Sequence, residues 1–506
     1  MSSKENFYFT LQGYHEEVTG SCIVCTIHFP NNSERKFLVD FGMFQESEYE
    51  HLNSEINFNQ NDIDAVLVTH SHLDHIGRLP YLVKNGYNGP IYSSYLTKLI
   101  STSILRNSAK IFQSNFEKEK RITRNPDLPL FSNEDVEDTL MLFETFKYNE
   151  KVDIDENISV TFLDNGHILS ASMILLEAKY KNRDPIYILF TGDYKSKNTF
   201  KEVISLPEYI LKLPLNIVCE STLCEEENIS YEASFKSRVI SCLDSKKGVL
   251  IPCLAQERFE EVLYELKKIQ ELGYSFEICV DAPLAEEIHK IYSRYSCTDY
   301  MPSNVIFVTS REEREIVFRS PKPRILLVSS GMCDFGNAPL YLNNFLDRSD
   351  YEVLFTSFLA KNTLGNQIMK LKRFKRIRIP GHPQSVKKMV ITHQTREFTS
   401  HAKTEELIEF ITQFENIKHV FINHGSSIAQ ETLKQKLNDL YIDSIILGTR
   451  KFHKVTSEDS VLTFDILDEE EEEEKKKSQN PSKGPTPNRT VPIFLRGGYS
   501  LNSKAI

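Results

Sequence analysis

The stretch VLVTHSHLDHIGRLP, residues 66–80, places three histidines and an aspartate within six residues, directly after a run of branched apolar side chains. The whole chain has only 14 histidines in 506 residues. A cluster of buried imidazoles and carboxylates needs a cation or hydrogen bonds to offset its desolvation. Side chains two apart face the same side of an extended strand end, so we expect His70, His72 and Asp74 to converge, while the turn into the next helix brings His75 round. These groups are ligands of zinc and can serve two adjacent ions, so the pattern predicts a metal site rather than a set of surface or hydrogen-bonded histidines.

Three further candidate ligands follow other apolar strands. His167 lies in DNGHILSAS, Asp193 in LFTGDYKS and His424 in VFINHGSS. Each of them alone is more typical of a satisfied core or loop residue, but together with the first cluster they supply what a two-ion site requires. Asp193 is suited to bridge two ions, because its two carboxylate oxygens can bind one ion each.

Composition bounds the class of protein. A length of 506 residues predicts two domains, or one domain with a large insertion. The chain is 40% hydrophobic and 26% charged, with no apolar run long enough to cross a bilayer and no apolar signal segment at its start, so we expect a soluble, cytoplasmic protein. Nine scattered cysteines do not form a disulfide framework. The net charge of −11 argues against coating of nucleic acid by general positive potential, so any attraction to it must be local.

The pattern of apolar runs changes twice along the chain. Between residues 60 and 200 each short apolar strand ends in a polar cluster, which is typical of a layered α/β protein. From about residue 205 to 390 strands alternate with helices. In the helix expected after Gln256 the apolar residues recur at helical spacing: Phe259, Val262, Leu263 and Leu266. This segment predicts a parallel α/β unit that interrupts the first unit. Residues 465–506 begin with an acidic run followed by a basic, Pro- and Ser-containing stretch, which predicts a flexible linker and tail.

These motifs resemble those of the metallo-β-lactamase superfamily and, within it, of the β-CASP nucleases. The family's HxHxDH motif matches residues 70–75, its preceding aspartate motif matches Asp40 in LVDFGMF, and its third and fourth motifs match His167 and Asp193. β-CASP motifs A, B and C match Glu220 in NIVCES, His401 in EFTSHAK and His424. A histidine at motif C is similar to the RNA-processing branch, and the resemblance covers about residues 8–450. It implies an α/β protein: a metallo-β-lactamase αββα sandwich in residues 1–204 and 391–464, interrupted by an inserted α/β β-CASP domain in residues 205–390.

The resemblance also implies a ligand set and a reaction. Two Zn²⁺ ions are expected, although the same ligands accept Mn²⁺ or Fe. One ion would take His70, His72 and His167, the other would take Asp74, His75 and His424, and Asp193 would bind both. The reaction would be hydrolysis of phosphodiester bonds in single-stranded RNA to a 5′-phosphate and a 3′-hydroxyl. The expected catalytic residues are His401 as general acid, Glu220 holding its ring, Asp74, and Asp40 orienting a ligand imidazole.

Contacts to flanking phosphates are expected in the inserted domain. The candidates are Arg258, Ser329, Ser330, Gly331, Lys361, Thr363 and Gly365. Ordinary turn chemistry explains most of these residues equally well. Gln256, Glu257, Asn362 and Lys403 depart from the family pattern, which affects loop geometry and substrate contacts but leaves every expected ligand in place. The basic run at residues 371–380 is either a substrate rim or, more simply, a solvated edge.

Two other functions stay open beside the ribonuclease. The protein could be a non-catalytic or partner-dependent subunit of an RNA-processing complex, but an intact set of buried charged ligands argues against lost chemistry. It could be a small-molecule hydrolase, but such an enzyme does not need the insertion with Glu220 and His401. We expect single-stranded RNA as the partner, no membrane, and either a homodimer or a partner from an RNA-processing or defence complex. Cleavage inside the strand and cleavage from the 5′ end are not distinguished by the sequence.

Overall fold

The computed structural model describes residues 7–465, apart from 15–17, 47, 122, 124–125, 226–233, 396, 449–450 and 456–459. The linker and tail expected from residue 465 onward therefore lie outside the described residues, except for Asp465 at the end of the last strand. Among the described helices, none combines the length and the apolar character that crossing a bilayer requires. All nine cysteines are free.

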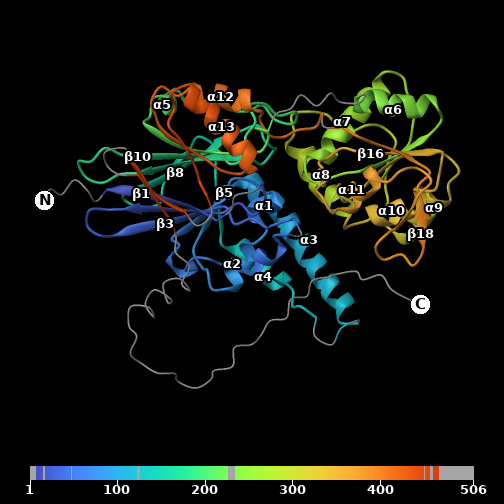
Figure 1. The fold of residues 1–506 in the computed structure, drawn as a ribbon, viewed down its shortest axis with the longest axis horizontal. Coiled ribbons are helices and arrows are strands. Elements are labelled where there is room, and N and C mark those ends of the chain that lie inside the picture. Colours follow the sequence, from blue (N-terminus) through green and yellow to red (C-terminus); the bar gives the residue numbers. More distant parts are fainter. Residues whose placement is uncertain are drawn as a thin grey trace. The chain divides into compact units, whose positions relative to one another are not determined.

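Two large sheets form the two central layers of the first structural unit (Figure 1). The eight-stranded sheet has the order β23-β22-β1-β2-β3-β4-β5-β6, with strands β1 Tyr8–Gly13, β2 Ile23–His28, β3 Glu34–Val39, β4 Ala65–Leu67, β5 Ile91–Ser94, β6 Phe143–Phe146, β22 Lys451–Val455 and β23 Val461–Asp465. The seven-stranded sheet has the order β21-β20-β11-β10-β9-β8-β7, with strands β7 Lys151–Asp153, β8 Ile158–Asp164, β9 Ser172–Ala178, β10 Ile186–Phe190, β11 Leu215–Cys219, β20 Ile417–Ile422 and β21 Ser444–Ile446.

The two sheets face each other across one hydrophobic core. This core joins side chains of β1 to β4, such as Leu11 and Phe37, with side chains of β8 to β11 and β20, such as Phe162 and Phe421. All residues of β8 and β9 are buried. Both faces of these strands are therefore covered, which explains why their sequences read as near-continuous apolar runs.

Helices cover the outer faces of the sheets (Figure 1). Next to the eight-stranded sheet are α1 Leu73–Ile76, α2 Leu79–Lys84, α3 Tyr95–Glu119 and α4 Asn133–Met141, with the 3₁₀ turns η1 Glu50–Ser54 and η2 Gln60–Asp62. Next to the seven-stranded sheet are α5 Glu208–Leu211, α12 Thr404–Thr412 and α13 Ser427–Asp439. Several helices start at polar N-cap residues; Ser132 and Asp135 form a reciprocal capping box on α4. The αββα sandwich predicted from the sequence is thus confirmed.

The inserted unit is a six-stranded sheet of order β14-β13-β15-β12-β16-β19, in which every neighbouring pair is parallel. Its strands are β12 Gly248–Pro252, β13 Ile278–Asp281, β14 Val305–Phe307, β15 Ile325–Val328, β16 Tyr351–Phe355 and β19 Ile391–Gln394. One face packs against α6 Phe235–Asp244, α7 Arg258–Glu271 and α8 Pro283–Tyr295, and the other against α9 Arg311–Arg319, α10 Ala338–Phe345 and α11 Leu364–Lys370. An antiparallel hairpin of β17 Arg376–Arg378 and β18 Ser385–Lys387 precedes β19. The four apolar residues expected on one face of the helix after Gln256 are all buried in α7.

Sheet membership differs from the domain boundaries expected at residues 205 and 390. Strand β11, which follows residue 205, pairs with β10 and β20 in the seven-stranded sheet of the sandwich. Strand β19, which follows residue 390, pairs with β16 in the inserted sheet. On the basis of these pairings we propose boundaries near residues 220 and 395 in place of the expected ones.

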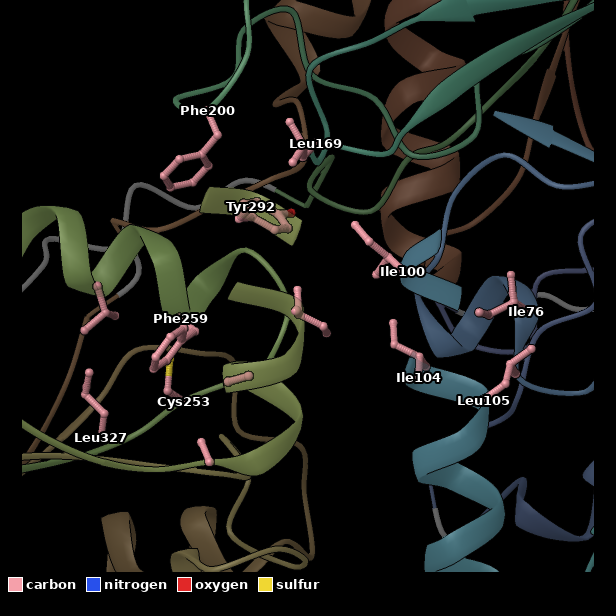
Figure 2. Packing of buried hydrophobic residues seen from close by; sticks show 14 of the residues in the cluster. Ile76, Ile100, Ile104, Leu105, Leu169, Phe200, Cys253, Phe259, Tyr292 and Leu327 are labelled. Carbon is pink, nitrogen blue, oxygen red and sulfur yellow. The ribbon is translucent and has the colours of Figure 1, made fainter. Parts of the chain in front are cut away.

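Side chains of the sandwich pack directly against the inserted unit (Figure 2). Phe200 lies in the segment after β10, and its ring centroid is 5.7 Å from that of Tyr292 on α8 and 5.3 Å from that of Tyr300. Figure 2 shows Leu169 of the β8–β9 loop beside the same region. These contacts connect the loop that carries His167 to the inserted unit.

Candidate metal centre and active site

The candidate ligands lie where strands of the sandwich end. Strand β4 ends at Leu67, so His70 and His72 lie in the loop that follows, while Asp74 and His75 belong to helix α1. His167 lies between β8 and β9, Asp193 follows β10, and His424 follows β20. The strand alternation used to place Asp74 beside His70 and His72 does not extend this far, because the chain has already turned into α1.

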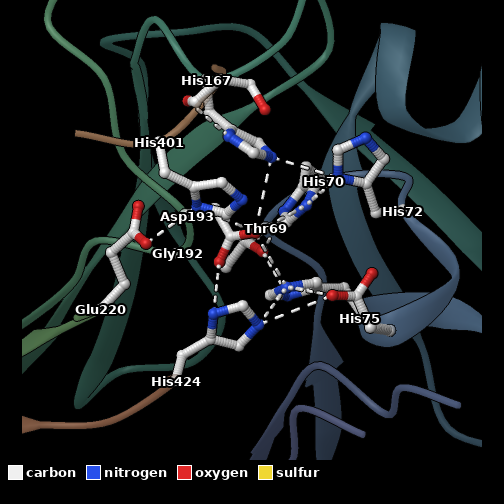
Figure 3. A network of polar contacts seen from close by, with 12 residues as sticks. Thr69, His70, His72, His75, His167, Gly192, Asp193, Glu220, His401 and His424 are labelled. Carbon is white, nitrogen blue, oxygen red and sulfur yellow. Dashed lines mark hydrogen bonds and ion pairs between the residues drawn. The ribbon is translucent and has the colours of Figure 1, made fainter. Parts of the chain in front are cut away.

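The structure brings these seven residues into two groups that share Asp193 (Figure 3). The first group is His70, His72, His167 and Asp193, and the second is Asp74, His75, Asp193 and His424; in each group the potential ligand atoms lie within 4.8 Å of one another. His72 Nδ1 is 3.1 Å from both His70 Nε2 and His167 Nε2. In the second group His75 Nε2 and His424 Nε2 are 3.2 Å apart.

Asp193 lies buried between the groups. Its Oδ2 is 3.3 Å from His75 Nε2, 3.4 Å from His167 Nε2 and 3.5 Å from His70 Nε2. Neither carboxylate oxygen accepts a hydrogen bond from the described residues. A buried carboxylate without hydrogen-bond donors is costly unless a cation lies beside it, so the donor set fits metal ions placed between Asp193 and the imidazoles.

Groups behind the imidazoles set which ring nitrogen carries the proton. His167 Nδ1 lies 2.9 Å from the carbonyl oxygen of Ser400, and His75 Nδ1 lies 2.7 Å from Asp40 Oδ2. Because both partners only accept hydrogen bonds, each Nδ1 carries a proton, which leaves Nε2 as the ring atom that can bind a cation. His70 Nδ1 lies 3.0 Å from the hydroxyl of Thr69, which donates its own proton to Asp40 Oδ2 and can therefore accept from the ring.

Two glycines allow the loops to come this close. Gly192 precedes Asp193 with a φ of 54°, and a Cβ there would lie 2.8 Å from Cβ of Thr69. A Cβ on Gly42, which follows the Asp40 motif, would lie 1.6 Å from the carbonyl oxygen of Asp74. Any larger residue at either position would push the ligand loops apart.

Burial and neighbouring charges shift the pKa values of several of these candidate ligands. It lowers the pKa of His70 and His167 well below the usual value and that of His72 to about 4, so these rings are neutral and can bind a cation. Burial opposes the charge on His75 as well, but Asp193 and Asp40 raise its pKa well above the usual value. Against the effect of burial, the neighbouring histidines hold the pKa of Asp193 well below its usual range, so it is a carboxylate.

His401 and Glu220 form a third group with Asp193. His401 lies before α12, and its Nδ1 is 2.9 Å from Glu220 Oε2 and 3.9 Å from Asp193 Oδ2. Glu220 follows β11, is buried, and accepts a second hydrogen bond from the backbone N–H of Tyr194. Burial lowers the pKa of His401, but Glu220 and Asp193 outweigh it and raise the pKa to about 9, so the ring carries a proton that it can donate.

Three family models match the chain. The metallo-beta-lactamase superfamily model matches residues 20–150, the Beta-Casp domain model matches 259–368, and the Zn-dependent metallo-hydrolase RNA specificity domain model matches 388–447. Together they span more than half of the chain and include His70 to His75, His401 and His424. The chain belongs to the β-CASP group of the metallo-β-lactamase superfamily. As a member of that group it is a metal-dependent hydrolase of the nuclease class.

The proteins similar to this chain include a ribonuclease and a transcription termination factor. Ribonuclease TTHA0252 of Thermus thermophilus is 26% identical over 416 residues, which cover 79% of this chain and 89% of the relative. Transcription termination factor FttA of Pyrococcus abyssi is 28% identical over 380 residues, covering 69% of this chain but only 55% of the factor. A crystal structure of a protein of unknown function from Enterococcus faecalis V583 covers 89% of this chain and all of that chain, with a TM-score of 0.51 at 13% identity, which shows a shared fold alone.

The residues of the β-CASP domain that were expected to contact phosphates differ in their surroundings. The Arg258 side chain donates to Glu261 Oε2 at 2.9 Å and to the carbonyl oxygen of Thr356, so its guanidinium holds loops of its own domain. Thr363 uses its hydroxyl to cap α11. The amide of Gly365 donates to the carbonyl oxygen of Met332 at 2.9 Å. For these three residues the local structure supplies a role without substrate, whereas Lys361 is exposed.

Three further candidates, Ser329, Ser330 and Gly331, lie in the loop after β15. A Cβ on Gly331 would lie 3.2 Å from Leu254 Cγ and from Ser357 Oγ, so this glycine allows the loops after β12, β15 and β16 to approach one another. The carbonyl oxygen of Ser329 accepts one hydrogen bond from the amide of Ala338, and the Ser330 amide donates to the carbonyl oxygen of Phe335. A phosphate-binding role for Ser329, Ser330, Gly331 and Lys361 stays a proposal.

Two residues that depart from the family pattern reach the ligand loops. Gln256 Nε2 donates to Ser71 Oγ at 2.6 Å, between His70 and His72. The buried carboxylate of Glu257 accepts from the amide of Leu169 at 2.8 Å, two residues after His167, and from the hydroxyl of Tyr292 at 2.5 Å. Glu257 has a φ of 59°, a left-handed backbone conformation that favours glycine. The sequence marked both positions as departures but held no signal for these long-range contacts.

Proposed function

We propose that this protein is a zinc-dependent ribonuclease that hydrolyses phosphodiester bonds of single-stranded RNA. The observation that carries the proposal is the position of Asp193. Its two oxygens accept no hydrogen bond from the described residues, lie between two groups of potential metal ligands, and include one, Oδ2, that is 3.9 Å from His401 Nδ1. A two-cation site with an adjacent proton donor suits the hydrolysis of a phosphodiester. The RNA specificity domain match and the name of the Thermus relative favour RNA as the polymer.

The ligand groups define where cations would be held. His70, His72 and His167 would hold one zinc ion, Asp74, His75 and His424 would hold the other, and Asp193 would bind both. Bound there, such ions lower the pKa of water and stabilise negative charge on phosphate oxygens. Asp40 keeps the proton of His75 on Nδ1, which leaves Nε2 available as a ligand atom.

His401 serves the leaving group. Glu220 holds Nδ1 of the ring, so Nε2 is the atom that presents a proton to the substrate. As water adds its oxygen to phosphorus and releases one proton to solvent, the bond from phosphorus to the 3′ oxygen breaks, and His401 donates its proton to that oxygen. The products are a 5′-phosphate and a 3′-hydroxyl. The raised pKa of His401 keeps the donor charged at neutral pH.

The other functions considered from the sequence are less well supported. A non-catalytic subunit has no need of a buried carboxylate whose oxygens lack hydrogen-bond donors, and a small-molecule hydrolase has no need of the β-CASP insertion. The proposal includes a cytoplasmic location and, as the working assembly, either a homodimer or a complex with an RNA-processing or defence partner. The mass of the purified protein in solution distinguishes these assemblies.

The test is cleavage of matched 5′-labelled single-stranded RNA and DNA by the zinc-loaded protein. We expect RNA to be cut and the ladder of products to separate cleavage inside the strand from cleavage at the 5′ end. His401→Ala is the matched control: it should keep both metals and lose about 10²- to 10⁴-fold in turnover, because only the general acid is removed. Cutting of neither polymer by a protein with two bound metals would refute the proposal, and full activity of His401→Ala would remove the proposed acid.

A further inference from the structure

One segment of the β-CASP domain has a charge opposite to that of the whole chain. Residues 353–396 contain ten Lys and Arg residues and no Asp or Glu, although the net charge of the chain is −11. The segment runs from β16 through α11 and the β17–β18 hairpin into β19. Six cations of the hairpin region, residues 372–387, are exposed: Lys372, Arg373, Lys375, Arg376, Arg378 and Lys387. We call residues 372–387 the basic hairpin.

The positive charge of the basic hairpin is not compensated nearby. Its arginines donate to neutral groups: Arg373 Nε to the carbonyl oxygen of Met389 at 3.0 Å, and Arg376 Nε to Ser385 Oγ at 2.9 Å. None of its six exposed cations forms an ion pair with a carboxylate in the part of the chain that the structure describes. Six like charges on about sixteen residues repel one another, so this surface favours a polyanion.

An aromatic side chain projects from the middle of the cations. Phe374 is 57% exposed and has a φ of 70°, a conformation that costs energy for a bulky residue. The backbone holds it there, because the Phe374 amide donates to the carbonyl oxygen of Lys388 at 2.7 Å. The Arg373 guanidinium lies 5.1 Å and the Lys387 ammonium 5.5 Å from the ring centroid. An exposed ring flanked by cations is how proteins stack bases of single strands while they bind the phosphates.

The basic hairpin lies at the end of the sheet opposite to the expected phosphate loops. Helix α11 starts at the carboxyl end of β16 and runs back, and β19 starts parallel to β16 with Ile391 opposite Glu352. The hairpin between them is therefore at the amino ends of the strands, and Figure 1 shows β18 at the outer edge of the domain. Loops 329–331 and 356–363 follow the carboxyl ends of β15 and β16.

We propose that the basic hairpin is a second binding surface for single-stranded RNA, remote from the metal centre. Its lysines and arginines bind phosphates, and Phe374 stacks on a base. The choice of RNA rests on the proposed function, and the exposed ring favours a nucleic acid over an acidic protein. Strands long enough to reach both the hairpin and the metal centre gain affinity over short ones.

The test measures binding without cleavage. The full-length, zinc-loaded protein carries His401→Ala, and its affinity for a fluorescein-labelled 40-nucleotide oligouridine is followed by anisotropy at several salt concentrations. The variant K372Q/K375Q/K387Q removes three exposed lysines whose side chains form no hydrogen bond with the described part of the chain. The control K110Q/K118Q/K120Q removes the same charge from exposed lysines of α3 and from Lys120, the residue that caps its carboxyl end.

We expect the hairpin variant to bind about tenfold more weakly and its log–log salt slope to fall by about 2, while the control binds like the parent. Phe374→Ala should weaken binding about tenfold without changing the salt slope. Equal RNA affinities of the hairpin variant and the control would overturn the inference. Polyglutamate is tested in the same way: a hairpin variant that binds RNA like the parent but no longer binds polyglutamate would also overturn it, and would indicate an acidic protein as the partner. Failure of the proposed function is separate, because it appears as absent cleavage in the protein that retains His401.

Discussion

Asp40 accepts hydrogen bonds from the amide of Thr69, from the hydroxyl of Thr69 and from Nδ1 of His75. Asn at this position tolerates the φ of 58° but presents an N–H₂ group to one of these donors. His75 would then lose the acceptor that keeps its proton on Nδ1. We expect Asp40→Asn to lower zinc affinity about 10- to 100-fold in chelator competition. Asp153→Asn, an exposed control on β7, should leave the affinity unchanged; equal affinities for the two variants would exclude this role of Asp40.

The single residues that the sequence predicted best are those held in short motifs. His70, His72, Asp74 and His75 could be found because four chemically suited side chains stand within six residues. Their division into two groups could not be read from strand alternation, since Asp74 and His75 lie on α1. The acceptor behind His167 is a backbone carbonyl, that of Ser400, and a carbonyl leaves no signal in the sequence.

The start of α7 links the β-CASP domain to the loop that carries His167, through the buried carboxylate of Glu257. Burial and the charge of Glu261 raise the pKa of Glu257 to about 7, against hydrogen bonds from Tyr292, Leu169 and Asn198. A raised folded-state pKa means that the native state binds more protons than the unfolded state between about pH 4.5 and 7, so stability falls as pH rises through this window.

Glu257→Gln removes this titration. We expect the variant to gain stability relative to the parent as pH rises from about 5 to 8, by on the order of 3 kcal/mol, in denaturant unfolding at each pH. Burial and, in part, the charge of Glu257 raise the pKa of Glu260 on the same helix well above its usual value, so removing the Glu257 charge lessens the loss of stability from Glu260 and acts in the same direction. Glu271→Gln, at the exposed end of α7, should follow the parent. Parallel stability curves for parent and Glu257→Gln would contradict the expectation.

The local pattern of a single element was predicted more reliably than the strands with which that element pairs. The helical spacing in α7 identifies its buried face correctly, because that pattern is local. Strand β11, with every residue buried, reads like a strand of either sheet, and only its pairing with β10 and β20 assigns it to the sandwich. The strand β22 pairs with β1 across more than 400 residues, which no local pattern could indicate.

Segments from distant parts of the chain converge on Asp193. The metal-binding side chains come from segments next to both large sheets, and His401 and His424 lie in the chain after the β-CASP insertion. Bound cations would therefore connect segments more than 300 residues apart.

An ion that binds only the native state stabilises it, by about 4 kcal/mol at a thousandfold excess over Kd. We expect chelation to lower the Tm by about 5 °C or more, and zinc to restore it. His401→Ala should keep this zinc-dependent shift, because His401 lies beside the ligand groups, whereas Asp193→Ala should lose it along with bound metal. A parent protein whose Tm is the same with zinc and with chelator, followed by differential scanning calorimetry, would show that the cluster around Asp193 holds no structural cation.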